Sequence, residues 1–275
     1  MKFSIITINY NNREGLQKTI ESVIHQSSHD FEYIIIDGGS TDGSAEVIKQ
    51  YSQHIDYWVS EPDKGIYNAM NKGISKASGE YLNFMNSGDT FYDDDVLRSS
   101  LPYMNKDILL GGCYNVANKR MSYQPPYANT MRYLYETAFS HQASFIKRTL
   151  FCNSPYREDL KIASDWEFFI RKLVFEDCSF STIPVTICNY DGNGVSANQE
   201  VATKERQRVL SELLPSKIWA DYDYFKGKDS RILQLCPLFN HTYRLEIFIY
   251  SAIRSILWIY YRILKHDRTT KIPHL

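Results

Sequence analysis

The sequence predicts an α/β fold in which a mostly parallel central sheet is flanked by helices. Over about the first 110 residues, short apolar runs alternate with amphipathic helical patterns, which is typical of parallel strands joined by crossover helices. The apolar runs are too short for helices, and several are followed closely by Asp, Asn or Gly, which favours buried strands. The expected strands cover residues 3–8, 31–36, 57–60, 81–85 and 107–110.

Apolar residues at helical spacing predict the helices between these strands. Residues 16–24 carry such a pattern, and Asn11 with Glu14 resembles a capping box at its start. Ser164 with Glu167 resembles a second capping box, at the start of a later helix. The other expected elements are helices around 47–48, over 66–77 and over 199–214, strands over 143–146 and 183–190, and a loop-rich connection over 114–140. One domain over 1–215 and a helical tail over 216–275 follow from this pattern.

The tail differs from the domain in composition. Residues 245–264 are mostly Ile, Leu, Tyr, Phe and Trp, with Glu246, Arg254 and Arg262 among them. These charges argue against a membrane-spanning helix. Basic residues beside a wide aromatic face fit a helix that lies on a membrane surface. A helix that packs on the domain or at a homodimer contact is an equally open interpretation.

The bulk composition narrows the class of protein. The formal net charge of −1 gives no argument for nucleic-acid binding. Five cysteines without a CxxC pair argue against a disulfide framework or a zinc knuckle and favour a reducing compartment. The N-terminal apolar run is too short for a signal peptide. We therefore expect a cytoplasmic protein, with the tail as a peripheral contact at the inner face of the membrane if it binds lipid.

Three acids, Asp37, Asp63 and Asp89, each follow an expected parallel strand. The carboxyl ends of parallel strands form the ligand crevice of open α/β sheets, where a carboxylate can hydrogen-bond a nucleoside or hold a hard cation. Asp is also a common turn residue, so this role stays open for each acid taken singly. Asn86 and Ser87 lie beside Asp89, and such oxygens suit Mg²⁺ or Mn²⁺ bound together with a substrate diphosphate.

A second centre is expected around Asp165. This carboxylate stands at the start of an expected helix, where it could serve as the general base that takes a proton from an attacking hydroxyl. The alternative is an acid that only stabilises the helix dipole. His141 precedes the strand at 143–146 and could face an acceptor or a diphosphate; a purely structural role is the alternative.

Six segments in order resemble the family-2 glycosyltransferases with the GT-A fold. They are Ser4–Asn11, Ile36–Gly43, Ser60–Ile74, Phe84–Asp89, Ser140–Ala143 and Ser164–Phe169. Their order and spacing cover roughly residues 3–215, and the branch that they resemble includes colanic-acid, capsule and lipopolysaccharide transferases. The resemblance implies a Rossmann-like sheet with a nucleotide-binding half over 1–112, an acceptor and catalytic half over 113–215, and a C-terminal helical extension.

The resemblance also implies roles for individual residues. Asp89 matches the last acid of the family's DXD-type metal motif, which holds Mg²⁺ or Mn²⁺, and Asp165 matches the catalytic base. Gly38 departs from the family, because a second acid is usual there, and so does Gly88 in the metal motif. The positions implied to contact the nucleotide sugar are Thr7, Asn9, Tyr10, Asp37, Asp63, Asn71, Asn86 and Ser87.

Together these features predict an inverting, metal-dependent glycosyltransferase that moves a sugar from a nucleotide sugar to a hydroxyl of a glycan or lipid-linked glycan in surface polysaccharide biosynthesis. A UDP-sugar is the family's default donor, and GDP- or dTDP-sugars also occur. The sequence has no QxxRW motif, so addition of a single sugar is expected. Two alternatives stay open. One is a nucleotidyltransferase, although Asn9–Asn12 stands where such enzymes usually carry a glycine-rich basic loop; the other is a non-catalytic nucleotide- or glycan-binding module.

Overall fold

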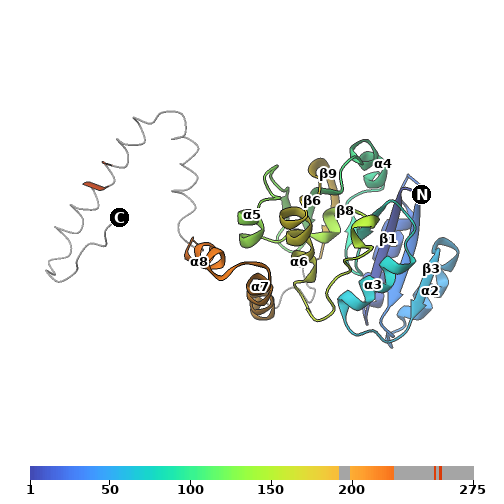
Figure 1. Ribbon diagram of the computed structural model, residues 1–275. Coiled ribbons are helices and arrows are strands. Elements are labelled where there is room, and N and C mark those ends of the chain that lie inside the picture. The colour runs from blue at the N-terminus through green and yellow to red at the C-terminus, as the bar shows by residue number, and fades with distance from the viewer. Residues whose placement is uncertain (192–198, 226–250, 252–253, 256–275) are drawn as a thin grey trace. The chain divides into compact units, whose positions relative to one another are not determined.

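The computed structural model describes residues 1–191, 199–225, 251 and 254–255 (Figure 1). The chain divides into two compact units, Met1–Tyr222 and Asp223–Leu275. All elements around the candidate site belong to the first unit. The predicted boundary between residues 215 and 216 stays a prediction.

One half of the sheet is parallel and contains the first four expected strands. Its order is β3 (Tyr57–Ser60), β2 (Phe31–Asp37), β1 (Phe3–Asn9) and β4 (Tyr81–Phe84). The register pairs Asn9 with Asp37 and Asp37 with Ser60, so three strand ends meet at one edge. Every residue of β1 is buried, which explains why apolar residues predominate in its sequence. The α/β class is confirmed.

Beyond β4 the sheet becomes mixed. β8 (Ser144–Lys147) pairs antiparallel with β4 and with β6 (Ile108–Asn115), and β6 pairs parallel with β9 (Phe180–Tyr190). Two strands were not expected, β5 (Thr90–Phe91) on β9 and β7 (Arg120–Ser122) on β6. At two and three residues, they are too short to leave a periodic pattern in the sequence.

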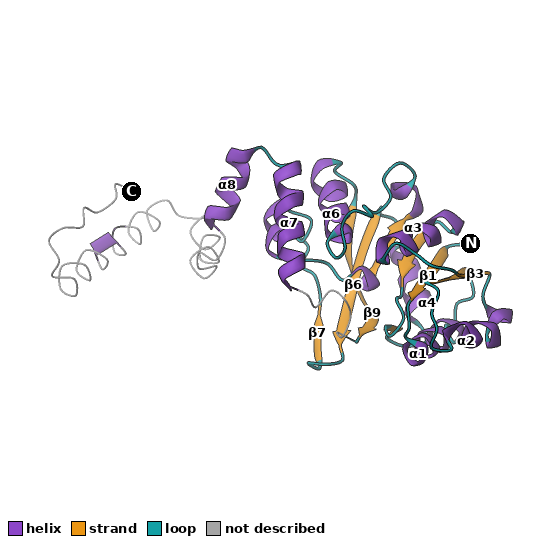
Figure 2. Cartoon of the chain, turned by 90° about the horizontal axis from the view of Figure 1, so that it is seen from below, coloured by secondary structure: helices purple, strands orange, loops and turns teal. Residues whose placement is uncertain are grey.

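Helices cover both faces of the sheet, with α1 and α2 on one face and α3 and α6 on the other (Figure 2). Alternate residues of β1 accordingly enter two separate cores: Phe3 and Ile5 pack with α1 and α2, whereas Ile6 and Ile8 pack with α3 and α6. The helices are α1 (Arg13–Ile24), α2 (Ser44–Gln50), α3 (Ile66–Lys76), α4 (Val96–Ser100), α5 (Met131–Glu136), α6 (Ser164–Ile170), α7 (Gln199–Leu213) and α8 (Ser216–Phe225).

Both predicted capping boxes are wrong. The N-cap of α1 is Asn12, whose side chain accepts a hydrogen bond from the backbone N–H of Gly15, because the helix begins one residue later than the pattern suggested. At α6, the Ser164 hydroxyl accepts from the backbone N–H of Arg157, and Glu167 pairs with Arg171 instead. The expected loop region 114–140 also contains β7 and α5.

The predicted surface helix at 245–264 falls almost entirely outside the described residues and stays a prediction. In the part of the chain that the structure describes, no helix combines the length and the apolar character that a membrane crossing requires. The described cysteines, Cys113, Cys152, Cys178 and Cys188, are free thiols.

Candidate active site

Asp37 organises the edge where β1, β2 and β3 end. It is fully buried and accepts hydrogen bonds from Asn9 Nδ2 at 2.7 Å, Ser60 Oγ at 2.6 Å, and both the backbone N–H and hydroxyl of Ser40. Burial raises the pKa of Asp37, but these hydrogen bonds outweigh it and hold the pKa below its ordinary value. Asp37 is therefore a sealed carboxylate that shapes the loop, and a direct contact with a nucleoside stays a prediction.

Buried hydrogen bonds of Thr7 and Asn9 stabilise this edge of the sheet. Thr7 is fully buried and donates to the carbonyl of Met85 at 2.7 Å, which ties β1 to the end of β4. Asn9 is 3 % exposed, and its Oδ1 has no hydrogen-bond partner among the described residues. Tyr10, in contrast, is 66 % exposed and offers a free ring face. Of these three predicted nucleotide contacts, only Tyr10 lies open to a ligand.

Tyr10 and Asp63 meet above Gly38. A Cβ added at Gly38 would lie 2.5 Å from Asp63 Oδ2 and 3.2 Å from the Tyr10 ring. The Asp63 carboxylate thus occupies the space of the second acid that Gly38 lacks, and Oδ1 of Asp63 accepts from the backbone N–H of Gly65 at 2.8 Å. This pair of an aromatic ring and a carboxylate is the arrangement that can stack on a base and hydrogen-bond it.

Gly38→Ala should therefore weaken nucleotide binding. The added methyl group must displace the Asp63 carboxylate, and we expect about tenfold weaker binding of a nucleoside diphosphate, the loss of roughly one charge-assisted hydrogen bond. Isothermal titration calorimetry with UDP measures this affinity. Asp63→Asn should show a similar loss. Unchanged affinity in both variants would remove Asp63 from the nucleotide site.

Asn71 has a structural role in this geometry. Its side chain donates to the carbonyl of Tyr156 at 2.9 Å and to Glu158 Oε1 at 3.0 Å, and its Oδ1 accepts from the backbone N–H of Tyr156. Asn71 therefore fixes the loop before α6 to α3. The structure gives no support to its predicted contact with the nucleoside.

The loop after β4 brings oxygen atoms together around Gly88. Asp89 is 6 % exposed; its Oδ2 accepts from Gln142 Nε2 at 2.7 Å and its Oδ1 accepts from the backbone N–H of Asp191 at 3.1 Å. The carboxylate of Asp191 lies 3.8 Å from the place of a Cβ at Gly88. Burial raises the pKa of Asp89, and the hydrogen bonds from Gln142 and Asp191 oppose the rise.

These oxygens fit a hard cation that is held chiefly by a ligand's own phosphates. Asp89, Asp191 and the Ser87 hydroxyl supply the carboxylate and hydroxyl oxygens that Mg²⁺ and Mn²⁺ prefer. The described residues form no cluster of three or more His, Cys, Asp or Glu side chains that could hold a metal by themselves. Neither Asp191 nor Gln142 was predicted as a site residue. The one feature of the sequence that could have indicated Asp191 is its position directly after the expected strand 183–190, which is a weak signal. The metal role of Asp89 stays a prediction.

Asp165 lies at the start of α6 and is 16 % exposed. Its Oδ1 accepts from the Tyr67 hydroxyl and from the backbone N–H of Trp166, each at 2.9 Å, and its Oδ2 accepts from His141 Nδ1 at 2.9 Å. Burial raises the pKa of Asp165, yet the hydrogen bonds, led by that from His141, bring it below its ordinary value. Asp165 is therefore ionised at neutral pH, as a general base must be.

His141 connects Asp165 to the loop after β4. Asn86 Nδ2 lies 2.9 Å from His141 Nε2. With the amide in this orientation, Nε2 accepts, so Nδ1 carries the proton and donates to Asp165. The next residue, Gln142, contacts Asp89. The structure thus brings Asp89 and Asp165 to one site through two consecutive residues, and it places His141 against the predicted base.

His141→Ala should raise the pKa of Asp165, because its main hydrogen-bond donor is lost. A base whose pKa rises is protonated at higher pH, so the acid limb of the kcat/KM profile should move to higher pH. We also expect kcat to fall about tenfold or more, the effect of one hydrogen bond to a charged group. His54→Ala, in the exposed turn η1 (Ser52–His54), is the control. An unmoved acid limb would contradict this role.

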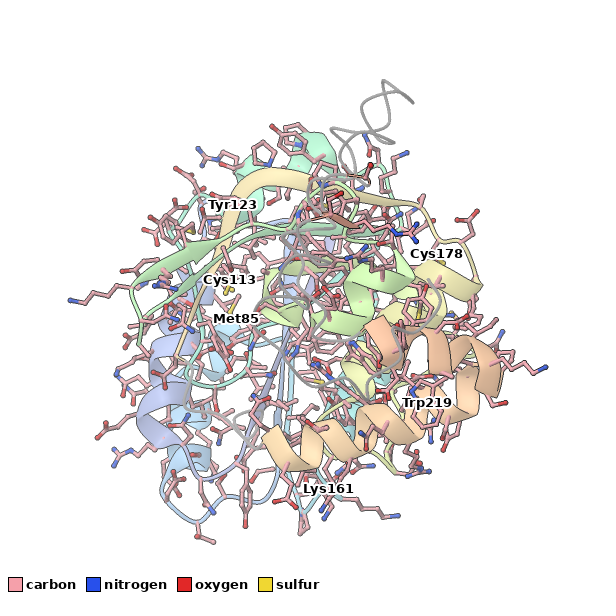
Figure 3. All side chains as sticks on the ribbon, turned by 90° about the vertical axis from the view of Figure 1, so that its left-hand side faces the viewer. Met85, Cys113, Tyr123, Lys161, Cys178 and Trp219 are labelled. Carbon is pink, nitrogen blue, oxygen red and sulfur yellow. The ribbon has the colours of Figure 1, made fainter. Side chains whose placement is uncertain are left out.

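A cavity of about 360 Å³ opens beside Asp165. Asn115, Gln124 and Tyr190 line it together with His141 and Asp165, so hydrogen-bonding groups surround the carboxylate. The described residues that line it all fall within 113–206; residues 1–112, all of which are described, contribute none. Cys113, at the β6 wall of the cavity, is labelled in Figure 3. Within the described residues, the cavity is therefore formed by the half of the domain that was predicted to hold the acceptor.

Comparisons with known proteins identify the family of this chain. The family "Glycosyl transferase family 2" matches residues 4–161. An uncharacterized glycosyltransferase of Mycobacterium tuberculosis is 33% identical over 205 residues, which cover 72% of this chain and 78% of the relative. A PGL/p-HBAD biosynthesis glycosyltransferase of Mycobacterium bovis is 29% identical over 178 residues, 62% of this chain and 68% of the relative. The chain belongs to the family-2 glycosyltransferases.

Solved structures show the same fold. TarS 1-349 of S. aureus in complex with UDP has a TM-score of 0.65 at 19% identity and covers 86% of this chain and 74% of its own. The mannosyltransferase PcManGT of Pyrobaculum calidifontis, in complex with GDP-Man and Mn²⁺, has a TM-score of 0.56 at 17% identity and covers 75% and 60%. The predicted GT-A fold is therefore confirmed, and the protein is a glycosyltransferase.

Proposed function

We propose that this enzyme transfers a single sugar, with inversion, from a nucleotide-diphosphate sugar to a hydroxyl of a glycan or lipid-linked glycan. The observation that carries the proposal is the position of Asp165. It is an ionised carboxylate at the wall of a cavity, and His141 connects it to the loop that carries Asp89. Direct displacement at an anomeric carbon requires one base on the acceptor side, and Asp165 fits that requirement.

The hydrogen bonds of Asp165 indicate which oxygen takes the proton. Oδ1 already accepts from Tyr67 and Trp166, whereas Oδ2 accepts, among the described residues, only from His141 and keeps one lone-pair direction. An acceptor hydroxyl in the cavity donates to Oδ2, its oxygen attacks the anomeric carbon, and its proton passes to Oδ2. The bond between that carbon and the diphosphate oxygen breaks at the same time, so one displacement inverts the configuration.

The donor lies across the strand ends of residues 1–112 in this proposal. Tyr10 and Asp63 contact the nucleoside, and Asn86, Ser87 and Asp89 lie near the diphosphate. Mg²⁺ or Mn²⁺, when bound by Asp89 with Asp191, would neutralise charge on the departing diphosphate. A UDP-sugar is the proposed donor, because TarS binds UDP-GlcNAc; a GDP-sugar is the second candidate, because PcManGT binds GDP-Man.

A role in surface polysaccharide or glycolipid synthesis extends the proposal. The M. bovis relative is a glycosyltransferase of PGL/p-HBAD biosynthesis. A cytoplasmic location, with the tail at the inner face of the membrane, would place the enzyme near a lipid-linked acceptor. Membrane contact and homodimer formation through the tail are also part of this proposal.

Acceptor-dependent release of a nucleoside diphosphate tests the proposed activity. The full chain is incubated with UDP-, GDP- and dTDP-sugars, Mn²⁺ and a panel of glycans, and the configuration of the product is read by NMR. One donor should yield a product with inverted configuration. A retained configuration would exclude the mechanism, and absence of transfer from every donor would favour a non-catalytic binding module.

A further inference from the structure

Arg206 is a cation of the cavity that the proposed reaction does not use. It lies on α7, where Gln199, Ala202 and Arg206 follow one another at intervals of three and four residues and all line the cavity. Other residues of α7 form exposed ion pairs, such as Lys204 with Glu200. In the sequence, Arg206 therefore resembles one more charge of a solvent-exposed helix, and it was not predicted as a site residue.

Among the described residues, at least one donor of the Arg206 guanidinium has no acceptor. Its Nε is buried, and no described residue accepts a hydrogen bond from it. Its Cζ lies 5.1 Å from the centre of the Trp166 ring, so an aromatic face supports the cation from one side. Burial lowers the pKa of Arg206, while Asp165 and Tyr67 oppose this change. A buried donor without an acceptor is costly, which points to a ligand that supplies one.

Hydrogen bonds of the neighbouring residue fix the position of Arg206 relative to Asp165. The neighbouring Glu205 accepts hydrogen bonds from three consecutive backbone N–H groups, those of Lys161, Ile162 and Ala163, immediately before α6. This clamp fixes α7 to the start of the helix that carries Asp165. Arg206 is therefore preorganised beside the proposed acceptor site, which limits the entropy lost when a ligand binds.

We infer that Arg206 recognises an anionic group, a carboxylate or a phosphate, on the acceptor. The inference rests on the proposed function and names its acceptor class. Guanidinium binds such groups with paired, charge-assisted hydrogen bonds. The donor's diphosphate is the less favoured ligand, since residues 1–112, all described, contribute no lining to this cavity. The positive charge of Arg206 also offsets the repulsion that Asp165 alone would exert on an acidic acceptor.

The test compares small probes that share hydroxyl groups and differ in charge. Methyl β-glucuronide carries a carboxylate, glycerol 3-phosphate carries a phosphate, and methyl β-glucoside is neutral. Binding to the full chain with UDP and Mn²⁺ is measured by ligand-observed NMR. We expect at least one anionic probe to bind about tenfold or more tightly than the neutral one. Preference for the carboxylate indicates an acidic sugar, and preference for the phosphate a phosphate-linked acceptor.

Substitutions on α7 test whether the preference for anionic probes depends on Arg206. Arg206→Gln should abolish it, Arg206→Lys should keep only part of it because the fork is lost, and Lys204→Gln on the same helix should leave it intact. UDP affinity should be the same in all four proteins. Equal binding of neutral and anionic probes by the unchanged protein would overturn the inference, as would weaker UDP binding in Arg206→Gln with the preference kept. Failure of the unchanged protein to bind any nucleoside diphosphate would instead count against the proposed function.

Discussion

Replacement of Asp165 with Asn should lower kcat by about 10²–10⁴-fold, the usual contribution of a general base. The amide has nearly the volume of the carboxylate but cannot take the acceptor's proton. Donor binding should persist, because the predicted nucleotide contacts Tyr10 and Asp63 lie on the other half of the site. Single-turnover kinetics measure the chemical step, and titration with UDP measures donor binding.

A matched control separates chemistry from folding for this variant. Asp177→Asn removes one carboxylate from an exposed turn whose left-handed backbone Asn also tolerates. It should leave kcat unchanged, and urea unfolding should show that Asp165→Asn is folded. Activity of Asp165→Asn within a factor of a few of the unchanged enzyme would mean that another group is the base.

Replacement of Asp89 with Asn should remove most of the metal dependence of donor binding. The substitution replaces one carboxylate oxygen by an amide N–H₂, which must face either Gln142 Nε2 or the backbone N–H of Asp191, both donors. The variant therefore loses negative charge and gains a donor–donor conflict of about 1–3 kcal/mol. We expect Mn²⁺ to tighten UDP binding at least tenfold in the unchanged enzyme and little in the variant, with kcat/KM lower by about 10².

Gln142→Leu distinguishes a metal ligand from a residue that only positions its neighbours. It removes the hydrogen bond to Asp89 but keeps the carboxylate. If Asp89 binds the cation, Gln142→Leu should retain most of the Mn²⁺ effect that Asp89→Asn loses. If a chelator weakens UDP binding equally in the unchanged enzyme and in Asp89→Asn, or weakens it in neither, Asp89 has no metal role.

The sequence was sufficient to predict that Asp165 lies at the start of a helix, but it did not predict the hydrogen-bond partners of this carboxylate. His141 was predicted to face an acceptor or a diphosphate, and in the structure its two ring nitrogens contact Asn86 and Asp165. Asn86, His141 and Asp165 are separated by 55 and 24 positions along the chain, so local patterns could not pair them. Asp37 was predicted to contact the nucleotide sugar, and in the structure Asn9, Ser40 and Ser60 surround its carboxylate. Its polar neighbours were visible in the sequence, but their distances were not.

By itself the sequence determined the α/β class, most of the strands and the acids that follow them, since burial on both faces leaves apolar runs and strand ends leave Asp and Gly. These signals are local, so they can be read from the sequence alone. Three contacts could be read only from the folded chain: Asp63 lies next to Gly38, Gln142 contacts Asp89, and Arg206 lines the cavity beside Asp165. Those contacts depend on how strands pair and how α7 packs against the start of α6, and segments far apart in the chain meet only when both are set.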